Sequence, residues 1–438
     1  MDIHIPFRLP SLREFSRDAR LLILVAGLTA ISFFGVHSLL RSLYLLRLGF
    51  GTEYLGAYYA VGALTFMAMG VPSGMLGQRF GTRRVMLVAG WLVTLGMLIF
   101  PVTQLIAQRW PDSLLLPAWP FVSQLVLTVG WSMYNVNTVP ALMAVTRDHN
   151  RSSAYALTSA LRSLGTFLGT LAGGALPAVF ARLFGLDPTL QSPTPYSYAL
   201  ITGALLGLLA IMPLGRIRTG QAPDADGDAI RQRGPFPFAI VASIILYVFL
   251  RHTAWTTCQA FCNPYMDEGL KLSTATIGAL TGAGQAAAVA GSLLIPRFSR
   301  RWHHGWIVVL STAILGVSLA LLGLWSHWLA AGLGLLGVQV AASIWLPALQ
   351  VFQMELVDEG WRGLSYGAVT MAMGSGFGSM SLVGGYYIEA RGYRPLFGLG
   401  VILAGVASLV MAVITLRATQ AVAPDPGRCA GELPEASS

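Results

Sequence analysis

Long apolar runs recur along the whole chain and are separated by short polar segments. A helix needs about 20 mostly apolar residues to cross the hydrocarbon of a bilayer. We expect these runs to be helices, because an open sheet edge would leave backbone groups without partners in lipid. The twelve candidate spans are 20–42, 54–77, 85–107, 117–145, 153–181, 196–215, 236–263, 273–296, 305–325, 328–354, 365–388 and 394–417.

The longest polar interruption lies near the midpoint of the chain and divides the twelve spans into two sets of six. We therefore predict an all-α membrane protein built from two six-helix halves. Its segments are a cytoplasmic N-terminus (1–19), a first half (20–216), a cytoplasmic linker (217–235), a second half (236–417) and a cytoplasmic tail (418–438). The tail is small, polar and proline-containing, which predicts disorder.

An internal repeat supports the division into halves. Ordered matches at two constant shifts are harder to obtain by chance than scattered matches between glycine-rich sequences. A shift of 222 pairs Gly56 with Gly278 and Arg79 with Arg301, and a shift of 211 pairs Arg151 with Arg362, Gly165 with Gly376, and Gly173–Gly174 with Gly384–Gly385.

Charge is scarce, at 11% of residues, against about 25% in soluble proteins. The net charge of +9 is compatible with nucleic acid or with basic loops held on one side of a membrane. The second reading fits better, because most arginines fall in alternate inter-span segments. With the N-terminus inside, the outer segments hold only Arg47, Arg109, Arg182, Lys271, Arg391 and Arg394.

This bias predicts a multi-pass protein of the inner cell membrane with both termini in the cytoplasm and no nucleic-acid partner. The compact chain and its preference for arginine favour a prokaryotic source. Three cysteines, two of them spaced i, i+4, form neither a disulfide framework nor a zinc pattern. Since no nucleotide loop, metal cluster or catalytic triad is present, we expect no enzyme activity, cofactor or metal.

One basic glycine turn, SGMLGQRFGTRR at 73–84, interrupts the apolar pattern. It resembles the G-x-L-x-D-R-x-G-R-[R/K] signature between helices 2 and 3 of the major facilitator superfamily. The resemblance implies a hinge and topology anchor, although Gln78 replaces the acidic position and cannot form its ion pair. The residues concerned are Gly74, Gln78, Arg79, Gly81, Arg83 and Arg84.

A second stretch, GTFLGTLAGG at 165–174, is similar to the G-x-x-x-G-P-x-x-G-G motif of drug/proton antiporters in the same superfamily. Thr170 stands where that motif has proline. A helix-packing face explains the same glycines equally well. The residues are Gly165, Gly169, Gly173 and Gly174.

The family resemblance implies a substrate site near the midplane between the halves, lined by helices 1, 4, 7 and 10. Polar and aromatic residues in those spans are our candidates. The seventh span carries a polar stripe on one helical face, because four polar residues follow at i, i+4, i+7 and i+11: His252, Thr256, Gln259 and Asn263. Under the 222 shift His37 falls opposite Gln259, and Arg41 falls opposite Asn263. The candidates are His37, Arg41, Trp131, Tyr134, Asn135, Arg251, His252, Trp255, Gln259, Asn263, Trp345 and Gln350.

The buried charge in the spans is basic, and no span carries a carboxylate at its centre. We therefore expect a monomeric secondary transporter for a small organic solute, with an anionic substrate favoured. A proton-coupled multidrug efflux antiporter is the alternative, with a histidine as the proton carrier. A non-transporting membrane scaffold or receptor on the same fold is the alternative from another class.

Overall fold

A computed structural model describes residues 15–146, 148–186, 192–217, 238–299, 302–357 and 361–422. The predicted N-terminal segment up to residue 14, nearly all of the linker and most of the tail lie outside these residues. The described part is helical and contains no strands, as the sequence predicts. Its nine helices that are long and apolar enough to cross a membrane match nine of the predicted spans.

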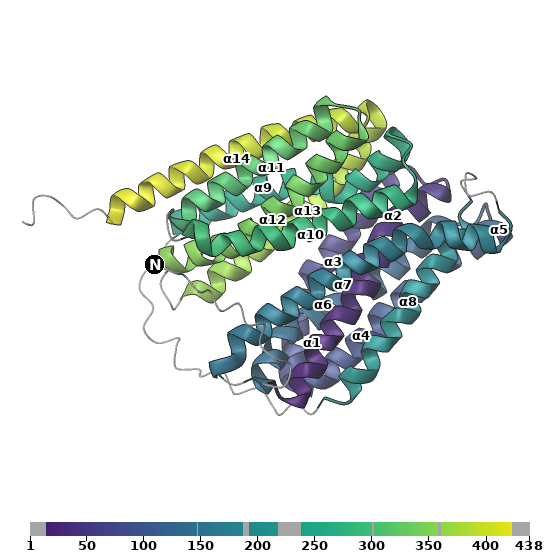
Figure 1. The fold of residues 1–438 in the computed structure, drawn as a ribbon, viewed down its shortest axis with the longest axis horizontal. Coiled ribbons are helices and arrows are strands. Elements are labelled where there is room, and N and C mark those ends of the chain that lie inside the picture. The colour runs from purple at the N-terminus through teal and green to yellow at the C-terminus, as the bar shows by residue number, and fades with distance from the viewer. Residues whose placement is uncertain are drawn as a thin grey trace, which may run out of the picture.

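The first half of the chain forms one group of helices, here called the N-bundle (Figure 1). It comprises α1 (Arg17–Thr29), the π-helical η2 (Ala30–His37), α2 (Ser38–Arg47), α3 (Thr52–Phe80), α4 (Thr82–Ile99), α5 (Val102–Arg109), α6 (Leu115–Val145), α7 (Asp148–Leu183) and α8 (Thr194–Gly215).

The second half forms the C-bundle, which is drawn from green to yellow in Figure 1. It comprises α9 (Phe238–Pro264), the π-helical η4 (Tyr265–Gly269), α10 (Thr274–Ser299), α11 (His304–Leu324), α12 (Trp328–Leu356), α13 (Arg362–Arg391) and α14 (Tyr393–Val422).

Two helices depart from the continuous spans that the sequence predicts. The first span runs from Arg17 to Arg47, but its middle, Ala30–His37, is π-helical. The third span is broken between α4 and α5, where Pro101 is the N-cap of α5. Proline has no backbone N–H with which to continue a helix. The apolar run continues past Pro101, but the helical hydrogen bonding does not, so hydrophobicity alone predicted one unbroken helix.

The two ends of the bundles differ. We call the end where α1 begins and α3 meets α4 the terminal side, and the end where α2 meets α3 the far side. In Figure 1 the bundles lie together near α2 and diverge towards the terminal side. The main contacts between them are made by α3 with α13 and by α7 with α10.

Glycine pairs allow these two crossings to be close. A Cβ on Gly56 would lie 2.3 Å from the carbonyl oxygen of Ser381 and 3.1 Å from the Cα of Gly385. A Cβ on Gly278 would lie 2.7 Å from the Cα of Gly174. Backbones this near leave no room for a side chain. The four glycines form two equivalent pairs of the internal repeat, Gly56 with Gly278 and Gly174 with Gly385. Positions that match in the repeat therefore make the contacts between the two bundles.

Candidate functional site

A central cavity of about 80 Å³ lies between the bundles and receives side chains from both. It lies between the two helix crossings, where η2, α2, α3 and α7 face α9, α10 and α12. The cavity is lined by Phe34, Ser38, Leu39, Arg41, Tyr59, Thr166 and Thr170 from the N-bundle and by Cys258, Gln259, Cys262, Asn263, Thr281, Gln285, Leu335 and Gln339 from the C-bundle.

Arg41 is the one charged residue that lines this cavity. Its guanidinium carbon lies 4.7 Å from the centroid of the Tyr59 ring, and its Nε has no hydrogen-bond partner. The described residues give Arg41 no ion pair, and no carboxylate lines the cavity. A cation held over an aromatic face, with free donors, is suited to an anionic or strongly hydrogen-bonding ligand.

The C-bundle wall supplies amides and hydroxyls rather than charge. Gln259 is exposed although it lies within a candidate membrane-spanning helix. The hydroxyl of Thr281 donates to the carbonyl oxygen of Ile277 at 2.8 Å and lies 3.5 Å from Oδ1 of Asn263. Gln285 and Gln339 extend the polar wall. Amides both donate and accept, so this wall can complement the donor-only guanidinium opposite.

Of the twelve predicted site residues, three line the central cavity: Arg41, Gln259 and Asn263. Arg251 lies elsewhere, inside the C-bundle, with 1% of its surface exposed. Its guanidinium carbon stands 3.7 Å from the centroid of the Trp345 ring. Its Nε and Nη2 have no hydrogen-bond partners. The structure therefore brings Arg251 and Trp345 together, but apart from Arg41.

The two histidines are also enclosed by aromatic rings. His37 is fully buried in the N-bundle, with its ring centroid 5.5 Å from that of Phe100. His252 lies against Trp255 at 4.7 Å and Trp345 at 5.9 Å. Neither nitrogen of His37 has a partner. Neither histidine lines the central cavity.

The remaining candidates are dispersed. Trp131 and Tyr134 stack at 5.7 Å and line a separate small cavity within the N-bundle. Asn135, the next residue on α6, is exposed. Gln350 on α12 donates to the hydroxyl of Tyr366 at 3.5 Å.

The basic turn lies on the terminal side of the N-bundle. Gly81 joins α3 to α4 with φ +85°, which a residue with a Cβ adopts only with strain. Arg83 donates to the carbonyl oxygen of Gly215 at 2.6 Å and so ties the start of α4 to the end of α8. Gln78, Arg79 and Arg84 are exposed, and Gly74 has only the Val136 side chain near its Cβ position.

The glycines of the α7 stretch face neighbouring helices closely. A Cβ on Gly165 would lie 2.4 Å from the carbonyl oxygen of Gly27, and one on Gly169 2.3 Å from that of Ile31. Gly173 faces Val36, with 3.1 Å between its Cβ position and the Val36 Cα. Gly174 makes the crossing with the C-bundle. This geometry accounts for the glycines through packing.

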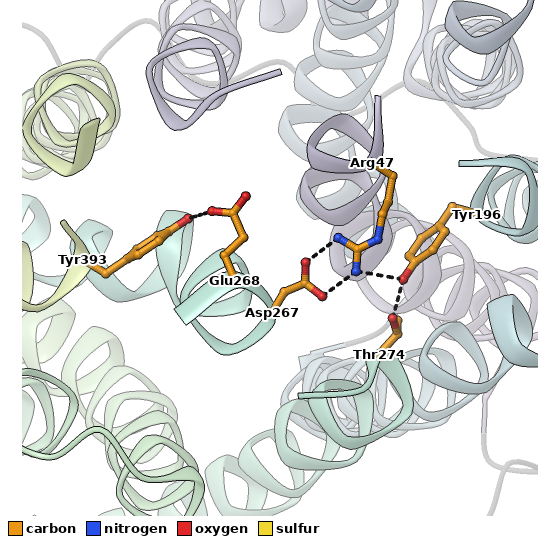
Figure 2. Close-up of polar contacts among 6 residues, drawn as sticks. All are labelled: Arg47, Tyr196, Asp267, Glu268, Thr274 and Tyr393. Carbon is orange, nitrogen blue, oxygen red and sulfur yellow. Dashed lines mark hydrogen bonds and ion pairs between the residues drawn. The ribbon is translucent and has the colours of Figure 1, made fainter. Parts of the chain in front are cut away.

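A polar cluster closes the interface on the far side (Figure 2). Arg47 binds both carboxylate oxygens of Asp267 at 2.6 Å, joining α2 to η4 across the bundles. Arg47 also donates to Tyr196 at 3.4 Å, and the Tyr196 hydroxyl bonds that of Thr274. On the other flank, Thr52 donates to the carbonyl oxygen of Gly385 at 3.2 Å. We call the Arg47–Asp267 pair the far-side latch.

The acidic neighbour of Asp267 points the other way. Glu268 accepts a hydrogen bond from the Tyr393 hydroxyl, which ties η4 to α14 within the C-bundle (Figure 2). The short π-helix thus aims two successive carboxylates at opposite partners. The pairing of Arg47 with Asp267 could not be predicted from the sequence, because the two residues are 220 positions apart and share no local pattern.

Several lining residues were missed by sequence reasoning. Tyr59 and Thr281 are equivalent under the 222 shift, one turn beyond the Gly56–Gly278 pair, so the repeat contained a signal for both. Thr166 and Thr170 were hidden among the packing glycines. Gln285 lies on α10, outside the four spans that the family resemblance implies line the site, although Thr281 lies four residues before it. Gln339 lies on α12, where Ser343 is its polar neighbour at helical spacing.

Comparison with solved structures supports the same fold. The chain is similar to a bacterial homologue of the iron transporter ferroportin in an inward-facing state, with a TM-score of 0.72, 16% identity, and 91% of this chain and 98% of that chain covered. It is similar to a D-xylose–proton symporter, with a TM-score of 0.70, 15% identity and coverage of 89% and 96%. It is also similar to the nucleoside transporter NupG, with a TM-score of 0.64, 15% identity and coverage of 91% and 98%.

No curated protein matches the chain. The model of the Major Facilitator Superfamily matches residues 3–170 and 244–431, which cover most of each bundle and most of the sequence. The chain therefore belongs to the major facilitator superfamily, as a multi-pass membrane protein of transporter type rather than an enzyme.

Proposed function

We propose that the protein is a secondary active transporter for a small organic anion, which binds in the central cavity. The observation that carries this proposal is Arg41, an unpaired cation facing a wall of amides and hydroxyls that the other bundle provides. An anion in this place would receive charge-assisted hydrogen bonds, which are about twice as strong as neutral ones.

Alternating access follows from the position of the site. The cavity draws its lining from two bundles that touch through glycine crossings and the far-side latch. Rocking of one bundle against the other would open and close these contacts around the bound solute. The described structure corresponds to a state closed on the far side.

The finer features of the proposal come from the sequence. The terminal side faces the cytoplasm, because the arginine-rich segments lie there. The protein works as a monomer in a prokaryotic inner membrane, and a proton is the candidate coupling ion. A D-xylose–proton symporter among the similar structures makes proton coupling worth testing.

Proton-coupled drug efflux is the second candidate. The aromatic rings around His252 favour it, because lipophilic cations bind aromatic walls. The unpaired charge of Arg41 argues against a cationic solute in the central cavity. A sealed core without a two-sided cavity would favour a scaffold or receptor on this fold.

A thermal-stability screen of the purified protein separates these candidates. The compounds are organic anions, neutral sugars and nucleosides, and lipophilic cations. A ligand present at 100 times its dissociation constant stabilises the folded state by about 2.7 kcal/mol. We expect stabilisation by anions in the wild type. Stabilisation by lipophilic cations alone would favour drug efflux, and no response to any class would favour a scaffold.

A further inference from the structure

A second pocket lies beside the far-side latch and is separate from the central cavity. Its volume is about 350 Å³, and it is enclosed by residues of α2, α7 and α8 on one side and of η4 and α10 on the other. Its lining includes both partners of the latch, Arg47 and Asp267, together with Lys271 and Ser273. The pocket is therefore built around the contact that holds the bundles together.

The charges in this pocket are unbalanced. Arg47 and Lys271 supply two cations, and Asp267 is the only carboxylate among the lining residues. The latch is largely withdrawn from solvent, with 10% of the Arg47 side chain and 4% of the Asp267 side chain exposed. Lys271 is exposed and is the only lysine in the chain. The described residues give it no ion pair.

We propose that this far-side pocket is an entry site for a dicarboxylate-sized organic anion, which opens the latch by replacing Asp267 on Arg47. The inference rests on the proposed anion transport and adds a second site to it. One carboxylate of the solute would take the bidentate position on Arg47. The other would lie near Lys271.

The exchange is physically reasonable because it substitutes like for like. Arg47 keeps a bidentate carboxylate, so its donors are not left unpaired. The cost of losing a partner falls on Asp267, whose carboxylate gains water as the far side opens. Asp267 loses its tie to the N-bundle. A ligand shifts an equilibrium only through its different affinities for the two states. Here the two states are the closed latch, in which Asp267 occupies the Arg47 guanidinium, and the open latch, in which the solute can bind it.

Double electron–electron resonance can follow the far-side separation directly. The full chain carries Cys258→Ser, Cys262→Ser and Cys429→Ser, with spin labels at Leu183→Cys and Trp325→Cys. These positions are 69% and 55% exposed and belong to opposite bundles. The probe is succinate, and its uncharged diamide serves as the control compound.

We expect succinate, but not the diamide, to shift the distance distribution to longer values. Asp267→Asn and Arg47→Gln should show the longer distances without succinate and should not respond to it. Lys271→Gln should raise the half-maximal succinate concentration about threefold, since one exposed charge contributes modestly. Arg109→Gln, which removes an exposed far-side arginine outside the pocket, should leave it unchanged.

Three results would overturn the inference. They are an absence of any succinate response, an equal response to the diamide, and an unaltered response in Lys271→Gln. The variant Arg41→Gln distinguishes a failure of the entry-site proposal from a failure of the proposed central solute site. It should retain the far-side response to succinate, and its loss would place the trigger in the central cavity and contradict the entry site.

Discussion

Arg41 and Arg251 are both arginines within membrane-spanning helices, one in each bundle, and both lie near an aromatic ring. Arg41 faces a cavity between two bundles and a wall of amides. Arg251 is sealed inside one bundle against Trp345. In the proposed rocking motion, Arg41 lies at the interface that moves, whereas Arg251 lies inside a bundle that moves as a unit. We therefore expect Arg41 to serve transport and Arg251 to serve packing.

The largest effect should come from blocking the movement itself. Gly278→Leu places a side chain where Gly174 and the Thr170 carbonyl oxygen lie within 2.8 Å of the Cβ position. Overpacking of this kind costs about 1–3 kcal/mol, and here it acts on closure of the far side. We expect uptake into proteoliposomes to fall by between about fivefold and 150-fold.

The matched control is Gly70→Leu on α3, because nothing lies within 4 Å of the Gly70 Cβ position. This variant should transport at the wild-type rate. Equal uptake by the two variants would show that the glycine crossing does not limit transport.

The Arg251 site should respond in stability rather than in transport. Replacement by methionine keeps an apolar stem and removes a charge that has no carboxylate partner among the described residues. Because an unpaired buried charge is costly, we expect Arg251→Met to melt at the wild-type temperature or above it. Trp345→Leu should lower the melting temperature by removing the ring beneath the guanidinium.

A double-mutant cycle sharpens this prediction. Trp345→Leu should be less harmful in the Arg251→Met background, with a coupling of about 2 kcal/mol for a desolvated cation–π contact. Additive effects of the two substitutions would mean that the 3.7 Å contact contributes nothing.

The smallest effect is expected at the ring under Arg41. Tyr59→Leu removes the aromatic face that holds the guanidinium at 4.7 Å, and it should weaken anion binding about three- to fivefold. Tyr59→Phe keeps the face and should bind like the wild type. Binding isotherms of both variants test this, and an equal loss in both would assign the effect to the Tyr59 hydroxyl instead.

The sequence predicted the helices well because a bilayer demands long apolar runs, and a run is a local property. The break at Pro101 and the π-helical turn in Arg17–Arg47 were missed, since both depend on backbone hydrogen bonding that apolar composition does not record. The repeat was more informative than expected. It identified the glycines Gly56, Gly174, Gly278 and Gly385 that form both crossings.

The candidate site was only partly predictable. Helical spacing placed His252, Thr256, Gln259 and Asn263 on one face of a helix, but only Gln259 and Asn263 line the central cavity. Helical spacing predicts which side of the helix a residue faces, but it does not predict where along the helix axis a cavity lies. Pairs such as Arg47 and Asp267 depend on how two distant segments meet, which no local pattern records.

Uptake of the most stabilising anion into proteoliposomes, compared among the wild type, Arg41→Gln and Arg251→Met, tests the central claim most directly. We expect Arg41→Gln to fold and melt normally and to lose at least about tenfold in uptake, because a hydrogen bond to a charged group contributes about 1.5–3 kcal/mol. Arg251→Met should transport like the wild type. Normal uptake by Arg41→Gln, or a loss confined to Arg251→Met, would contradict the assignment of the solute site to the central cavity.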